Sequence, residues 1–169
     1  MRRLAVALSF SLVVLALIPA AASARGPQKN DSVNGHGFVV ADFGTTYEFR
    51  VSAHTLSTTT TAATGNMYVQ QTISDASGTT TVSVWADVYC LSVLAINGEV
   101  RGHIYRTEPD LLTVPEDLVF NVSDLNPVTS GPDLFSVTDV PAPSACIEPP
   151  EPGLLPVAKG DVTVNDEGP

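Results

Sequence analysis

The chain has few basic residues and no apolar run long enough to cross a membrane. Its 169 residues include 8 Lys and Arg against 18 Asp and Glu, a formal net charge of −10 at pH 7. Nucleic acids and anionic lipid surfaces are recognised by clustered Lys and Arg, so neither is an expected partner. The longest apolar stretch, Leu4 to Ile18, is about 15 residues, whereas a membrane-spanning helix needs roughly 20.

The sequence also lacks the common motifs of active sites and metal sites. It contains no G-x-S-x-G nucleophile elbow, no H-x-H or H-x-x-x-H pair and no D-x-[DN]-x-[DN]-G calcium loop. The three histidines are His36, His54 and His103, and the last two fall on the polar faces of expected strands. We therefore expect solvated histidines, no metal, no cofactor and no enzymatic activity.

The first 24 residues have the pattern of a secretory signal peptide. A basic start, Met1-Arg2-Arg3, precedes the apolar run, and Ala22-Ser23-Ala24 supplies the small residues of a cleavage site. We expect cleavage after Ala24 and secretion of the mature chain, with no membrane attachment afterwards. Removing Arg2 and Arg3 leaves 6 basic residues against 18 acidic ones, a net charge of −12. A retained N-terminal anchor is the alternative.

The chain has two cysteines, Cys90 and Cys146. In an exported protein such a pair predicts one disulfide, because the compartment is oxidising. The chain-entropy estimate for closing a loop of this length is about 4 kcal/mol. The bond would tie a proline-rich arm, residues 141–156, to the end of a central strand. Two free thiols are the alternative.

Apolar and polar residues alternate with a period of two through much of the mature chain, as in half-buried β-strands. After a flexible lead-in at 25–32, we expect one domain at 33–166 with about eight short strands. The predicted fold class is all-β, a single antiparallel β-barrel or barrel-like sandwich; a barrel is preferred because it pairs the first strand with the last. The expected strands cover 33–41, 46–54, 66–74, both halves of 79–106, 118–122, 134–140 and 157–165.

The centre of this pattern is a hairpin, Thr79 to Arg106, with Asn97-Gly98 as its expected turn. Asn-Gly suits a type I′ turn, because both central residues need φ > 0. A turn at this position would place Asp87 opposite Glu108. Since Asp87 then does not face Glu99, the two acids are not expected to form the carboxylate pair of a glycosidase.

Three aromatic residues of this hairpin, Trp85, Tyr89 and Tyr105, are predicted to form a strip, with Tyr89 opposite Arg106. If the strip faces solvent, it is a candidate binding surface for a sugar or a peptide; if it faces a second layer, it belongs to the core. Both faces of the first strand carry apolar residues, as expected where a strand is covered on two sides or changes sheet near a bend. Core is the preferred interpretation.

The order of these segments resembles that of a known group of proteins. It has a Gly-punctuated strand at Val33–Val40, an aromatic strand at Tyr47–Ala53 and a Cys-containing hairpin at Cys90–Ile104. It ends with Pro132-Asp133-Leu134-Phe135 and a returning strand, Gly160-Asp161-Val162-Thr163-Val164. This layout resembles uncharacterised secreted bacterial proteins common in high-GC Gram-positive bacteria. The resemblance implies an exported all-β domain of unknown function and supplies no catalytic residues that could be assigned to this chain.

These observations predict a non-catalytic structural or interaction module at the cell surface or in the medium, with a cell-surface protein or glycan as its partner. One alternative is a barrel that carries a small apolar ligand, lined by Phe49, Met67, Val84 and Val100; a filled interior would argue against it. The other is a hydrolase, which would need the histidines and acids to converge in one cleft.

Overall fold

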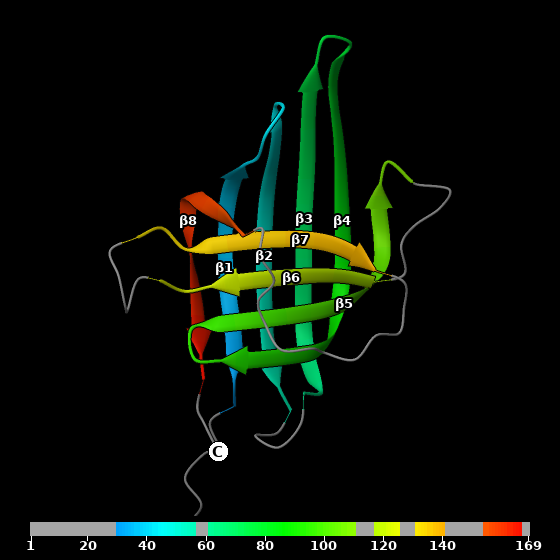
Figure 1. Cartoon of the computed structure of the whole chain (residues 1–169). Helices are drawn as coiled ribbons and strands as arrows, with labels where there is room; N and C mark the ends of the chain where they lie inside the picture. Colours follow the sequence, from blue (N-terminus) through cyan, green and yellow to red (C-terminus); the bar gives the residue numbers. More distant parts are fainter. Residues whose placement is uncertain (1–29, 57–60, 111–116, 126–130, 141–153, 167–169) are drawn as a thin grey trace, which may run out of the picture.

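The computed structural model describes residues 30–56, 61–110, 117–125, 131–140 and 154–166, and these form an all-β structure (Figure 1). Each strand pairs antiparallel with the next one in sequence, and the last pairs with the first, so the sheet is a closed barrel. The predicted fold class is therefore confirmed. The eight strands are β1 (Ser32–Val40), β2 (Thr45–Thr55), β3 (Ala63–Asp75), β4 (Gly78–Leu94), β5 (Asn97–Glu108), β6 (Asp117–Ser123), β7 (Leu134–Val140) and β8 (Leu155–Asn165).

Several predictions concern residues that the structure does not describe. They include the signal peptide at 1–24 with its cleavage after Ala24, most of the lead-in, and residues 141–153 of the arm predicted at 141–156, among them Cys146. Cys90 lies in β4 and is buried, with 6% of its surface exposed. The disulfide between Cys90 and Cys146 thus stays a prediction.

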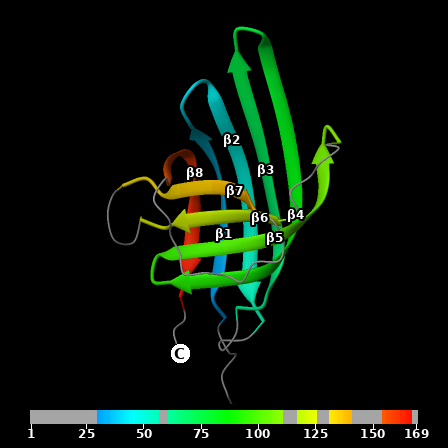
Figure 2. The same cartoon turned by 45° about the vertical axis from the view of Figure 1, so that its right-hand side comes forward.

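The barrel is flattened into two crossing layers, with β5–β7 running across β1–β4 (Figures 1 and 2). The pairing of β4 with β5 shifts twice, between Trp85 and Ala86 and between Val88 and Cys90. Such bulges bend and twist a strand pair, and here they lie where both strands pass from one layer to the other. This bend explains why both faces of β4 carry apolar residues.

The turn between β4 and β5 differs from the prediction. Leu94 pairs with Asn97, so the loop is residues 95–96, and Ala95 has a φ of 55°. Gly98 lies within β5, where a Cβ would come 2.6 Å from Cγ2 of Val33. The predicted Asn97-Gly98 turn is wrong because this glycine is used for the close approach of β5 to β1.

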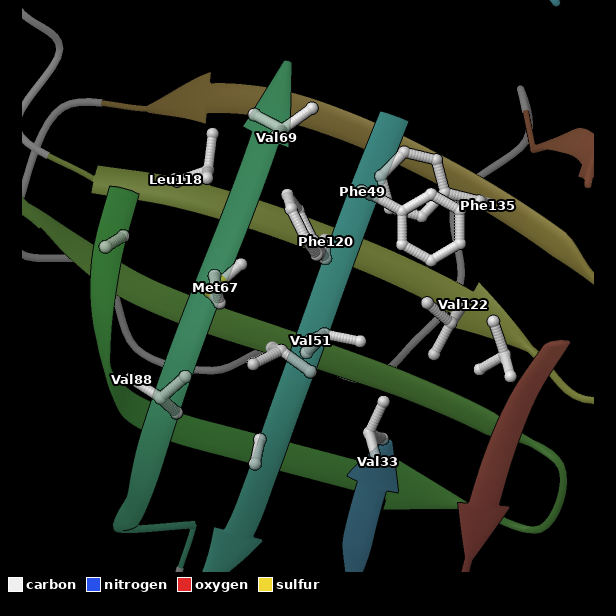
Figure 3. Packing of buried hydrophobic residues seen from close by; sticks show 14 of the residues in the cluster. Val33, Phe49, Val51, Met67, Val69, Val88, Leu118, Phe120, Val122 and Phe135 are labelled. Atoms are coloured by element: carbon white, nitrogen blue, oxygen red, sulfur yellow. The ribbon is translucent and has the colours of Figure 1, made fainter. Parts of the chain in front are cut away.

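Packed side chains fill the middle of the barrel (Figure 3). The rings of Phe49 and Phe135 stack with 3.9 Å between centroids, and Phe120 meets both edge-on. Gly37 leaves room for this cluster, because a Cβ there would lie 2.6 Å from the Phe49 ring. Burying each aromatic ring contributes about 1.5–3 kcal/mol. Other buried apolar residues include Val33, Val39, Val51, Ala53, Met67, Val69, Ala86, Val100, Leu118, Val122 and Val162.

The junction of β7 and β8 has a ladder of only two residue pairs. Beyond that ladder, side chains accept the backbone hydrogen bonds of β8. Oδ2 of Asp133 accepts the N–H of Val162 at 2.8 Å, and Oδ2 of Asp124 accepts that of Val164 at 3.2 Å. Both aspartates are buried, 3% and 6% exposed. Carboxylates therefore take the place of a partner strand along this part of β8.

Candidate binding surface

The predicted aromatic strip is not part of the core. Trp85 and Tyr89 are half-buried, and Tyr105 is 57% exposed. The residue opposite Arg106 is Trp85, so the predicted pairing of Tyr89 with Arg106 is wrong. The reason is the earlier turn together with the two bulges. Tyr89 is the extra residue of the second bulge, and its hydroxyl donates a 2.7 Å hydrogen bond to Asp117.

Trp85 belongs instead to a row of four side chains that lie directly opposite one another on β2, β3, β4 and β5. The row is Arg50, Tyr68, Trp85 and Arg106. The two rings are 5.2 Å apart, and the guanidinium carbons lie 6.0 Å and 4.5 Å from the neighbouring ring centroids. We call it the arginine–aromatic row. Cross-strand and cation–π contacts of this kind contribute about 0.5–1 kcal/mol each.

Tyr68 was missed by the sequence analysis, although a signal for it exists. It lies between Met67 and Val69, which are buried, and a period of two therefore places it on the outer face. Its partners depend on the register of three strand pairs, which the sequence does not specify. Without that register, the sequence could not predict that these four side chains lie next to one another.

Each arginine of the row also has an acidic neighbour two residues along its own strand, on the same face. Nη2 of Arg50 lies 3.2 Å from Oε1 of Glu48, and Arg106 pairs with Glu108 in the same way. These side chains are 46–69% exposed, and exposed ion pairs contribute only about 0–1 kcal/mol. Their main effect is to balance the two positive charges locally.

Beside the row, the outer face around β1 is hollowed. This cavity, which we call the β1 hollow, has a volume of about 580 Å³, within the roughly 300–1,000 Å³ typical of ligand sites. Gly160, with a φ of 110°, lets β8 lie close to β1, since a Cβ there would be 2.1 Å from the carbonyl oxygen of His36. The residues lining the hollow are Gly35, His36, Gly37, Phe38, Glu48, Phe49, Arg50, Lys159 and Gly160.

The walls of the β1 hollow combine donors, an acceptor and an apolar ring. Arg50 and Lys159 are donors only, whereas the Glu48 carboxylate is an acceptor. Phe38 is 36% exposed and lies opposite Lys159 on one side and Glu48 on the other. Arg50 belongs to both the hollow and the row, so the guanidinium of a residue that lines the hollow lies beside the ring of Tyr68.

The positive charges of the described residues are concentrated here. The described parts of the chain contain four Lys and Arg residues, and three of them, Arg50, Arg106 and Lys159, lie in the hollow or the row. The fourth, Arg101, is buried together with Glu99, and each is 5% exposed. Nε of Arg101 lies 2.8 Å from Oε1 of Glu99, so the two charges are buried as a pair.

The three histidines are exposed, as predicted, and the structure does not bring them together. They lie on β1, β2 and β5. Nδ1 of His103 is 3.3 Å from Oδ1 of Asp117. Asp87 lies opposite His103, so its predicted position opposite Glu108 is wrong. Across the described strands and loops, no three His, Cys, Asp or Glu side chains are placed to share a metal ion.

The residues proposed to line an internal ligand site are part of the packed core. Phe49, Met67 and Val100 are 0–1% exposed, and Val84 packs against them partly buried. Side chains thus occupy the space in which the alternative prediction placed a ligand. This packing favours the outer surface as the place where a ligand binds.

Comparisons of this chain with protein-family models, with curated proteins and with solved structures found no match. The resemblance to secreted bacterial proteins therefore stays a prediction. In the part of the chain that the structure describes, there is no helix with the length and apolar character needed to cross a lipid bilayer.

Proposed function

We propose that this chain is an exported, non-catalytic binding module that takes its ligand on the outer face of β8, β1 and β2, in the β1 hollow. One observation carries the proposal: an exposed aromatic ring, a carboxylate and two exposed cations meet around a cavity of about 580 Å³. Convergent polar groups around an apolar surface are the usual features of a ligand site.

Export is supported by the signal-peptide pattern of residues 1–24. The ligand is then something met at the cell surface or in the medium. Expression of the full chain in a Gram-positive host, followed by N-terminal sequencing of the protein recovered from the medium, tests this part. We expect Arg25 as the first residue. Protein that stays with the cells and begins at Met1 would contradict export.

A non-catalytic role is supported by how the acidic residues are used. Asp117 accepts the hydroxyl of Tyr89 and lies beside His103. Asp124 and Asp133 accept backbone N–H groups of β8. These three acids make structural contacts. The carboxylate that lines the hollow is that of Glu48.

Binding to cell envelopes tests the hollow itself. The labelled full chain is incubated with envelopes of a high-GC Gram-positive bacterium, and the bound fraction is compared between two double variants. F38A/R50Q should bind about tenfold more weakly, because it loses the contacts that the Phe38 ring and the Arg50 guanidinium make with the ligand. F43A/R106Q removes the same groups outside the hollow, since Phe43 is 95% exposed in the β1–β2 turn, and should bind like the unmodified chain. Equal binding by both variants would contradict the proposal.

A further inference from the structure

We infer that the β1 hollow binds an uncharged sugar unit of a neutral polysaccharide. The inference rests on the proposed function and adds the chemical class of the ligand. Three features of the surface carry it: the balance of its charges, the mixture of its hydrogen-bonding groups and the exposed ring of Phe38.

The charges of the surface are balanced. Arg50 pairs with Glu48, and the other cation of the hollow, Lys159, lies two residues from the acidic Asp161 on β8. The chain as a whole carries a net charge of −10. An anionic polymer would therefore be repelled at long range and would have to displace Glu48 from Arg50. A neutral ligand meets neither obstacle.

The hydrogen-bonding groups suit hydroxyls. Each sugar hydroxyl can donate one hydrogen bond and accept others, so a sugar ring needs donors and acceptors close together. Glu48 and Arg50, on β2, supply an acceptor and a donor on one side of β1, and Lys159, on β8, supplies a donor on the other side. Hydrogen bonds to charged groups are stronger than those between neutral groups, which compensates for displaced water.

The aromatic side chains divide into two roles. Phe38 is exposed next to the cavity, and the C–H face of a sugar ring carries the positive polarity that an aromatic face attracts. Arg106 covers the ring of Trp85, and Arg50 lies beside that of Tyr68. These two rings therefore hold the arginines in place, and Phe38 is the platform for the sugar.

A peptide added as an extra strand fits this place poorly. β1 forms the centre of the hollow and is paired with β2 on one edge and with β8 on the other from Ser32 to Val39. Strand addition requires an open edge. A compact unit that contacts side chains alone is the better match to the cavity.

The test measures binding of four oligosaccharides to the full chain by isothermal titration calorimetry. Maltohexaose, cellohexaose and hexa-N-acetylchitohexaose are neutral, and hexagalacturonate is anionic. We expect at least one neutral oligosaccharide to bind, with a Kd that changes less than about twofold between about 0.05 M and 0.5 M NaCl, because salt screens only charge interactions.

Matched variants locate the binding site. F38A and R50Q should each weaken binding of the neutral oligosaccharide about tenfold, whereas F43A and R106Q should change it less than about twofold. All four residues are at the surface, and thermal unfolding by circular dichroism checks that each variant is folded. Equal losses in R50Q and R106Q would overturn the assignment to the hollow.

The remaining outcomes separate the two proposals. Binding of hexagalacturonate alone, weakened by salt, would overturn the neutral class and leave the binding module. Failure of all four oligosaccharides would overturn the sugar inference; if F38A/R50Q still lost envelope binding, the proposed function would stand. If F38A/R50Q and F43A/R106Q bound envelopes equally, the proposed function would fail as well.

Discussion

β3 and β4 share ten residue pairs, whereas β7 and β8 share two. The long β3–β4 hairpin extends beyond the other strands (Figure 2) and is held by its own ladder. The short junction is held by Asp133 and Asp124, which accept N–H groups of β8. The difference shows that, among the described residues, two buried carboxylates accept N–H groups of β8 beyond its short ladder with β7.

The two junctions also differ in how many hydrogen bonds remain when one is lost. On the outer face of β3–β4, hydrogen bonds join Thr72 to Thr81 and Ser74 to Thr79, in addition to the ladder. Losing one of them leaves its neighbours in place. At β7–β8, Asp133 accepts the buried N–H of Val162 and Asp124 accepts the part-buried N–H of Val164, so the loss of either carboxylate leaves an N–H without that acceptor.

This difference bears on the candidate site. β8 carries Lys159 and Gly160, which line the β1 hollow. The carboxylates that hold β8 to the barrel therefore also hold one wall of the hollow. Mutations at the junction should affect ligand binding without touching the ligand.

The largest effect is expected for Asp133→Ala. Its carboxylate accepts two backbone N–H groups, from Leu125 at 3.0 Å and from Val162 at 2.8 Å. Hydrogen bonds to charged groups contribute about 1.5–3 kcal/mol each, so the free energy of unfolding should fall by about 3 kcal/mol. Urea denaturation measures this. A loss below about 1 kcal/mol would show that the β7–β8 ladder suffices.

A smaller effect is expected for Asp124→Ala. Its Oδ2 accepts the N–H of Val164 at a longer distance, 3.2 Å, and one such bond contributes about 1.5 kcal/mol. The same denaturation experiment gives the value. If Asp124→Ala cost more than Asp133→Ala, the proposed ranking of the two carboxylates would be wrong.

On the redundant side of the comparison, Thr72→Val should change stability by less than about 0.5 kcal/mol. Thr72 gives up one exposed hydrogen bond to Thr81, and valine favours a strand as strongly as threonine does. Thermal unfolding compared with Asp124→Ala is the measurement. A loss as large as that of Asp124→Ala would remove the distinction between the two junctions.

The smallest effect concerns pH at the tip of β3–β4. A hydrogen bond from the Ser77 hydroxyl, and a second from its backbone N–H, lower the pKa of Asp75 below 3.8. The turn should therefore be tightest above about pH 3.8 and loosen as pH falls through the lowered pKa. An NMR titration of Asp75 should show a higher midpoint in Ser77→Ala. An unchanged midpoint would exclude the hydroxyl as the main cause.

The fold was largely predictable because alternation is a local signal. Leu134–Val140 was predicted with the bounds that the structure has, and the pairing of the first and last strands followed from the need to close the sheet. The turn at 95–96 was not predictable in this way. Asn97-Gly98 is a strong local signal, but Gly98 is needed against Val33, more than 60 residues away in sequence.

The candidate site was predictable only in part. Trp85 was identified, and Arg50 falls within the expected strand 46–54. The hollow forms because β8 pairs with β1, which places Lys159 opposite Phe38. No local sequence pattern specifies which residues of these two strands lie opposite each other. Aspartate is likewise a common residue in turns, so the sequence suggests only a turn at Asp133. The N–H that its side chain accepts belongs to Val162, on another strand.

The most direct test of the closure of β8 is hydrogen exchange at the amides of Val162 and Val164, followed by NMR in the unmodified chain and in Asp133→Asn. The asparagine keeps the shape of the side chain but offers one acceptor oxygen where the aspartate offers two. We predict that Val162 is protected in the unmodified chain and exchanges much faster in Asp133→Asn, while the β3–β4 amides are unchanged. Equal protection of Val162 in both proteins would contradict closure by the carboxylate.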